Sequence, residues 1–238
     1  MRSLRQNYEA TVIACYIGYI TQAIVNVLAP LLFLTFQRQF GISLARITLL
    51  STVNFGVQLL VDLASPRIVG RVGYRAGVIV AHVCAAAGLL CLGLLPGILP
   101  NPYIGMLISV VLYAIGGGLI EVLVSPIVEA APTKNKEAAM SLLHSFYCWG
   151  VLAVILLSTA FFSTAGIEHW PALSSLWAII PICNNCLFSF VPIRSPEIRS
   201  KGKLSHLYRR EYPKAPLWSH HRSLQVLRNS RYSHYNKW

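Results

Sequence analysis

The chain has 238 residues, of which 55% are hydrophobic and only 12% are charged, and its mean hydropathy is +0.57. Soluble domains carry about 25% charged residues, so this composition excludes an ordinary soluble fold and indicates an integral membrane protein. The net charge of +12 does not indicate nucleic-acid binding, because 11 of the 20 Lys and Arg residues lie in a basic segment after residue 193.

Six apolar stretches are each long enough to cross a bilayer with a hydrocarbon core of about 30 Å. They occupy residues 10–36, 47–68, 76–95, 103–130, 138–162 and 172–193. Helices are expected, because a spanning segment in lipid must satisfy its own backbone hydrogen bonds. The predicted fold is therefore an all-α membrane protein, with a six-helix transmembrane bundle over residues 1–193. Residues 194–238 are predicted to form a basic, disordered cytoplasmic tail.

Basic residues between the apolar stretches fall mostly on alternate loops. They are Arg2 and Arg5 before the first stretch, Arg67, Arg71 and Arg75 after the second, and Lys134 and Lys136 after the fourth. Arg38 and Arg46, on the first outer loop, are the exceptions. Because Lys and Arg favour cytoplasmic loops, we expect a multi-pass protein of the plasma (inner) membrane with both termini in the cytoplasm.

The two halves of the bundle show a faint internal similarity. Asn26-Val-Leu-Ala-Pro30 in the first stretch is similar to Glu121-Val-Leu-Val-Ser-Pro126 in the fourth. Leu49-Leu-Ser-Thr52 in the second is similar to Leu142-Leu-His-Ser145 in the fifth. Each match requires a one-residue shift, so chance is a competing explanation. The pattern fits a three-plus-three inverted repeat.

Glu121 is the most informative single residue, because it lies in the middle of the fourth apolar stretch. A carboxylate in hydrocarbon is costly, so it should face a cavity or a partner. A titratable group at this depth is also a candidate proton carrier. The glycines at positions 116–118 allow another helix or a ligand to approach closely. A structural hydrogen bond to a neighbouring helix is the alternative, and the position within the membrane favours a functional role.

Two pairs of amides share a spacing of four residues, which places each pair on one helix face. Gln22 and Asn26 lie on the first predicted helix, and Asn54 and Gln58 lie on the second. Amides at these positions can bind the hydroxyl groups of a sugar-like solute, or they can join neighbouring helices. The sequence favours neither role.

Three further polar positions are candidates for function. His144 and Tyr147 lie in one aromatic segment of the fifth predicted helix, and histidine titrates near neutral pH. Packing is the alternative for this pair, but an aromatic segment suits the face of a sugar ring. Asp62 lies near Arg67 and Arg71 in the sequence. It is interpreted as a solvated charge at a helix end, with a gating ion pair as the second hypothesis.

The sequence gives little support for an enzyme. It contains no Gly-x-Ser-x-Gly motif and no His, Cys or Asp cluster with metal-ligand spacing. We therefore predict neither a metal site nor a cofactor. An intramembrane serine protease would need Ser51 or Ser141 close to His82 or His144, and nothing in the sequence selects such a pair.

Three segments resemble one known family. Gly118–Pro126 resembles a Gly-x-Leu-Glu…Asn-Pro stretch on its helix four, and Gly73–Gly77 resembles its basic loop between helices two and three. Ser141–Gly150 resembles its Asn-Leu-x-Gln-x-Phe…Gly stretch on helix five. Through these segments, residues 10–193 resemble the fucose permease-like sugar–proton symporters of the major facilitator superfamily.

The resemblance implies two six-helix bundles that rock around a central site, of which this chain would supply the N-terminal half. It implies that Glu121 takes the place of a sugar-binding acidic residue. Asn26 takes the place of an acidic residue tied to proton coupling, and the other expected lining residues are Gln22, His144 and Tyr147. The cytosolic loop with a gating role would include Asp62, Arg71, Gly73 and Arg75.

The expected function is proton-linked transport of a sugar or similar small polar solute across the bilayer. We interpret the chain as a truncated half, with residues 194–238 arising from truncation or a shifted reading frame. Such a half would need a second copy or a separate C-terminal half as its partner. We do not expect nucleic acid as a partner. The alternatives are an inactive or structural membrane fragment and, less favoured, an intramembrane enzyme.

Overall fold

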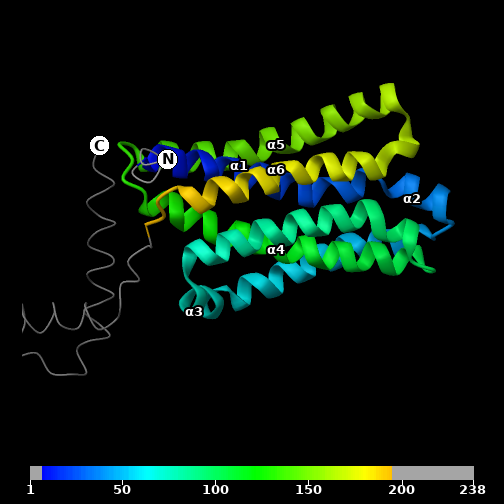
Figure 1. The fold of residues 1–238 in the computed structure, drawn as a ribbon, viewed down its shortest axis with the longest axis horizontal. Helices are drawn as coiled ribbons and strands as arrows, with labels where there is room; N and C mark the ends of the chain where they lie inside the picture. The colour runs from blue at the N-terminus through cyan, green and yellow to red at the C-terminus, as the bar shows by residue number, and fades with distance from the viewer. Residues whose placement is uncertain (1–6, 195–238) are drawn as a thin grey trace, which may run out of the picture. The chain divides into compact units, whose positions relative to one another are not determined.

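The structure is a computed structural model, and it describes residues 7–194. Within this range every regular element is helical, as the sequence predicts for an all-α membrane bundle. Figure 1 shows the long helices lying side by side. The predicted tail, residues 194–238, lies outside the described residues apart from its first residue.

The described elements are α1 (Tyr8–Leu31), α2 (Phe33–Phe40), α3 (Leu44–Ile98), α4 (Pro102–Ala130), α5 (Lys136–Ala165), the short 3-10 helix η2 (Ile167–His169) and α6 (Trp170–Phe190). Three asparagine side chains satisfy backbone N–H groups at helix starts. Asn7 accepts from Glu9 N at 2.9 Å, and Asn101 and Asn135 do the same for α4 and α5. These caps fix where the helices begin.

The sequence predicted one helix over residues 10–36, but the first apolar stretch forms two helices. It breaks at Leu32, where ψ is 3°, and α2 continues to Phe40. Pro30 lies just before the break and has no N–H to donate to the carbonyl of residue 26, which weakens the last turns of α1. Gly41 then ends α2 in a left-handed conformation, with φ at 64°.

The second and third apolar stretches are joined by helical turns rather than by a loop. α3 runs through both, and the one non-helical residue within it is Gly73, with φ at 80° and ψ at 165°. A residue with a side chain rarely adopts this conformation. Figure 1 shows that the chain reverses direction in this region. Because α3 has 55 residues and a crossing needs about 20, α3 contains two crossings.

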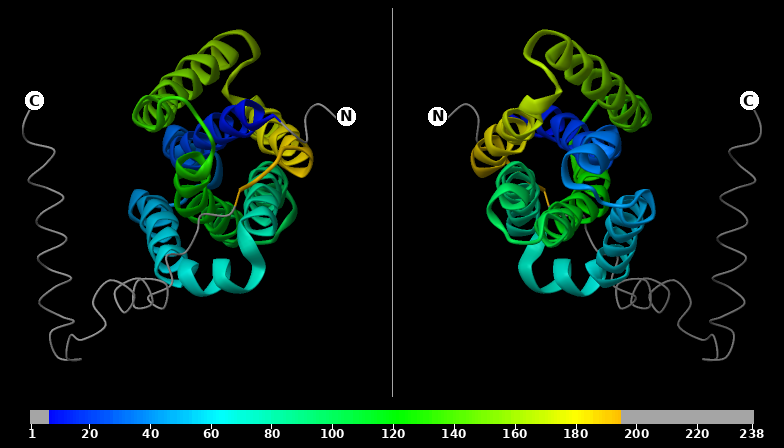
Figure 2. Two further views of the ribbon diagram at one scale, coloured as in Figure 1. Left: turned by 90° about the vertical axis from the view of Figure 1, so that its left-hand side faces the viewer. Right: turned by 90° about the vertical axis from the view of Figure 1, so that its right-hand side faces the viewer.

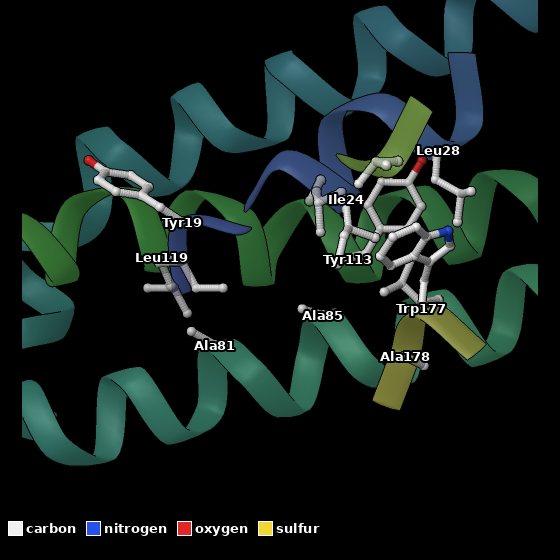
Figure 3. Packing of buried hydrophobic residues seen from close by; sticks show 14 of the residues in the cluster. Tyr19, Ile24, Leu28, Ala81, Ala85, Tyr113, Leu119, Trp177 and Ala178 are labelled. Carbon is white, nitrogen blue, oxygen red and sulfur yellow. The ribbon is translucent and has the colours of Figure 1, made fainter. Parts of the chain in front are cut away.

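α1 and α4 form the centre of the bundle. α1 packs against α4, α5 and α6, and α4 packs against both parts of α3. Their buried contacts include the residues labelled in Figure 3: Tyr19, Ile24, Leu28, Ala81, Ala85, Tyr113, Leu119, Trp177 and Ala178. The pairing of α1 with α5 and of α4 with the first part of α3 is the pairing that an inverted repeat would give. The repeat itself remains a prediction.

Candidate functional site

The structure brings most of the predicted site residues together where α1, α4, α5 and the first part of α3 approach one another. Gln22 of α1 is central to this group. Its Nε2 donates to Glu121 Oε2 at 3.2 Å and to Gln58 Oε1 at 3.1 Å. Gln58 and Glu121 therefore contact the same amide, although they lie 36 and 99 positions after Gln22 in the sequence.

The hydrogen bonds continue from Gln58 toward α5. Gln58 Nε2 donates to Asn26 Oδ1 at 2.8 Å and to Asn54 Oδ1 at 3.0 Å. Asn54 Nδ2 donates to the same Asn26 oxygen at 3.1 Å, and Asn26 Nδ2 donates to the hydroxyl of Tyr147 at 3.3 Å. We call these six side chains the amide network; its members are Gln22, Asn26, Asn54, Gln58, Glu121 and Tyr147.

The network has a buried interior and an open end. Gln22 is 2% exposed and Gln58 is 4% exposed, whereas Glu121 is exposed and Tyr147 is half-buried. An exposed carboxylate at the middle of a membrane helix requires an aqueous cavity or a covering partner. The open face of the bundle beside Glu121 is therefore the candidate binding site.

Aromatic side chains border the open face. The ring of Tyr19 lies 5.5 Å from that of His144 and 6.4 Å from that of Tyr147, between ring centroids. The Tyr19 hydroxyl is hydrogen-bonded to Ser125 Oγ at 2.9 Å, one turn beyond Glu121 on α4. The rings of the predicted site residues His144 and Tyr147 therefore both lie next to the ring of Tyr19.

Three residues of this region were missing from the predicted site. Tyr19 lies three residues before Gln22 and seven before Asn26, so helical spacing placed it on the same face. Asn54 and Gln58 had the same spacing as Gln22 and Asn26. The sequence contained these signals, but it did not show which residues of different helices meet.

The predicted gating residues do not form an ion pair in the structure. Within residues 7–194 the recorded salt bridge joins His169 and Glu168, and it does not involve Asp62. Asp62 Oδ1 is buried and has no hydrogen-bond partner among the described residues. The described part of the chain therefore does not support an ion pair between Asp62 and an arginine.

Arg75 has a contact that the sequence did not reveal. Its guanidinium donates to the carbonyl oxygens of Phe188 at 3.0 Å, Ser189 at 3.2 Å and Val191 at 2.7 Å. These carbonyls end α6, where a positive charge complements the helix dipole. Arg75 therefore joins the second part of α3 to α6. Arg71 is exposed and Gly73 forms the bend, and a gating role for this loop remains a prediction.

His82 is separated from the site. It is fully buried, with Nδ1 2.8 Å from the carbonyl oxygen of Val78 and Nε2 2.9 Å from Asn184 Nδ2. Within residues 7–194, neither His82 nor His144 is hydrogen-bonded to Ser51 or Ser141. The described residues also contain no group of three His, Cys, Asp or Glu side chains placed to hold a metal ion.

These features define the class of the protein. Five described helices are long and apolar enough to cross a membrane, and α3 is long enough to cross it twice. With a polar network at the centre of the bundle, the chain is a multi-pass α-helical membrane protein.

The family follows from comparison with known proteins. The family model described as Major Facilitator Superfamily matches residues 13–233, and the chain belongs to this superfamily of secondary transporters of small solutes. The match extends 40 residues beyond residue 193, where the resemblance was expected to end. Comparison with curated proteins finds no match.

Proposed function

We propose that this protein moves a small polar solute of the sugar type across the membrane, and that Glu121 binds both the solute and the coupled proton. The observation that supports this most directly is the position of the Glu121 carboxylate. It lies on the open face of the bundle, and it is held there by a buried amide of α1 at 3.2 Å.

The chemistry of the surrounding residues suits neutral hydroxyl groups. The amide network presents carboxylate, amide and phenol groups, which can accept and donate hydrogen bonds to vicinal hydroxyls. It contains no Lys or Arg, so it offers no cation to an anionic solute. The rings of His144, which is exposed, and Tyr147, which is half-buried, lie beside it and provide flat apolar surface, and the buried ring of Tyr19 packs against both.

Proton coupling is assigned to Glu121 rather than to Asn26. An amide does not take up a proton in this pH range, so Asn26 can only orient its neighbours. Glu121 is the titratable member of the network that is exposed on the open face. A proton gradient could therefore act on the site through this one carboxyl group.

Uptake by vesicles tests the proposal. Protein reconstituted into liposomes should accumulate at least one of a panel of radiolabelled monosaccharides and polyols, and more so with the vesicle interior alkaline. Protein-free liposomes provide the background. Accumulation no greater than this background for every solute in the panel would contradict the proposal.

The open face also points to a second six-helix unit. In Figure 2 the first part of α3 and α5 lie at two edges of the bundle, with α1 and α4 between them. Both edges carry large exposed apolar side chains, such as Leu59 on α3 and Trp149 and Leu152 on α5. We propose that a second unit covers these edges and completes the solute site, with both termini of this chain in the cytoplasm.

Pairing of two copies gives a specific crosslinking result. In a protein whose six native cysteines are replaced, Leu152→Cys should form covalent dimers in membranes treated with a short bismaleimide. Ile179→Cys is the matched control, because it is similarly exposed but lies on α6, away from the two edges. Equal dimer yields from the two variants would contradict pairing of two copies through this face.

A further inference from the structure

The amide network has a direction, because each of its hydrogen bonds has one donor and one acceptor. Gln22 donates to Glu121 and to Gln58. Gln58 donates to Asn26, and Asn26 donates to the hydroxyl of Tyr147. The donors therefore point from the amide beside Glu121 through the interior of the bundle to Tyr147.

The carboxylate determines this direction. An ionised carboxylate accepts hydrogen bonds and cannot donate, so Gln22 must turn its NH2 group toward Glu121. The same nitrogen meets Gln58 Oε1 at 3.1 Å, which leaves Gln58 to turn its own NH2 group toward Asn26. The Asn26 oxygen is then occupied by two donors, and its NH2 group faces Tyr147.

One unsatisfied atom shows what this orientation costs. Gln22 Oε1 is buried and has no hydrogen-bond partner within residues 7–194. An unpaired buried acceptor is unfavourable, whereas a hydrogen bond to an ionised carboxylate is stronger than one between neutral groups. The charge on Glu121 therefore offsets the unpaired oxygen. A neutral Glu121 would offset it less, and its hydroxyl could itself become a donor to Gln22.

We propose that the amide network transmits the charge state of Glu121 to Tyr147, with Gln58 as the positioning residue at its centre. While Glu121 is ionised, the Tyr147 hydroxyl accepts from Asn26 and keeps its own proton free for an acceptor on the solute. Protonation of Glu121 removes the charge that orients Gln22. The amides are then free to reverse, and Tyr147 donates to Asn26.

The consequence for transport rests on the proposed function, because it assumes that a solute meets Tyr147. Proton binding at Glu121 would then change the hydrogen bond that Tyr147 offers to this solute. Other titratable groups lie near Glu121: Asp62 from α3, Tyr19 from α1, and His144 beside Tyr19 on α5. Asp62 is the acid among them.

Infrared difference spectroscopy during a pH titration tests the inference without any solute. The full-length protein is reconstituted in lipid nanodiscs. The carboxyl C=O band lost in Glu121→Gln reports Glu121, and the tyrosine C–O band lost in Tyr147→Phe reports Tyr147. In the wild type the two bands should change with the same midpoint.

Breaking the network should make the pH dependence of the Tyr147 band independent of that of the Glu121 band. In Gln58→Met, which keeps the side-chain length but removes the hydrogen bonds, the Glu121 band should still titrate and the Tyr147 band should no longer follow it. Gln22→Met removes the first hydrogen bonds of the network and should give the same result. It replaces Gln58→Met in the experiment if Gln58→Met does not fold. Gln37→Met, at an exposed position on α2, is the matched control and should behave as the wild type.

Two results would overturn the inference. One is a Tyr147 band that does not change in the wild type while the Glu121 band titrates. The other is a Tyr147 band that follows Glu121 equally well in Gln58→Met and in the wild type. Neither result depends on uptake, so a failure of the relay is distinguishable from a failure of the proposed transport function.

Discussion

Replacing Glu121 by glutamine is expected to reduce solute uptake by about 10- to 100-fold at low solute concentration. A hydrogen bond to a charged group contributes about 1.5–3 kcal/mol, and each 1.4 kcal/mol corresponds to about a tenfold change in affinity. Glutamine has the same shape as glutamate but cannot take up a proton. The remaining uptake should therefore no longer respond to an imposed proton gradient, which separates the loss of coupling from a loss of affinity.

Glu129→Gln is the matched control for this experiment. Glu129 lies on the same helix, is also exposed, and has no recorded contact with the amide network. Its uptake and its response to the gradient should equal those of the wild type. Uptake by Glu121→Gln that matches Glu129→Gln in rate and in gradient dependence would remove Glu121 from the site and from proton coupling.

The sequence was sufficient to predict an all-α membrane bundle because apolar length is a local property. Four of the six apolar stretches lie within described helices, whereas the first is broken at Leu32 and the sixth extends three residues past the end of α6 at Phe190. The break at Leu32 and the single bend at Gly73 were not predicted. Both depend on the backbone conformation of one or two residues, to which average hydropathy over a long window is insensitive.

The candidate site was predicted as a set of residues but not as a network. Helical spacing showed that Gln22 and Asn26 share a face, because that is a property of one helix. It could not show that Gln22 meets Glu121, or that Gln58 lies between Gln22 and Asn26, since these contacts depend on how three helices pack. The same limit applies to Arg75, whose partners on α6 lie more than 110 residues away in the sequence.

Close packing of α4 against α3 positions Glu121 beside the network, and glycines make this packing possible. A Cβ atom on Gly118 would lie 3.0 Å from Val61 Cβ and 3.1 Å from Gln58 Cα, on the first part of α3. A Cβ atom on Gly116 would lie 2.5 Å from Ala85 N and 2.6 Å from Ala81 O, on the second part. Small residues permit such backbone approach between membrane helices.

Gly116→Ala should therefore destabilise the bundle strongly for a one-carbon substitution. The added methyl group would meet backbone atoms, which cannot rotate away as a side chain can, so α3 and α4 must separate. Overpacking of this kind costs about 1–3 kcal/mol and occasionally more, a loss that should exceed the gain of about 1 kcal/mol in helix propensity from alanine. Unfolding in mixed detergent and SDS micelles, followed by circular dichroism, measures the difference.

Gly97→Ala is the control, because among the described residues no atom outside its chain neighbours and its own helix backbone lies within 4 Å of the position that its Cβ would occupy, and Gly97 also lies in α3. This variant should be as stable as the wild type or slightly more stable. From most to least stable, the expected order is Gly97→Ala, wild type and Gly116→Ala. If Gly116→Ala unfolds at the same SDS fraction as Gly97→Ala, the backbones of α3 and α4 do not approach as closely as the structure places them.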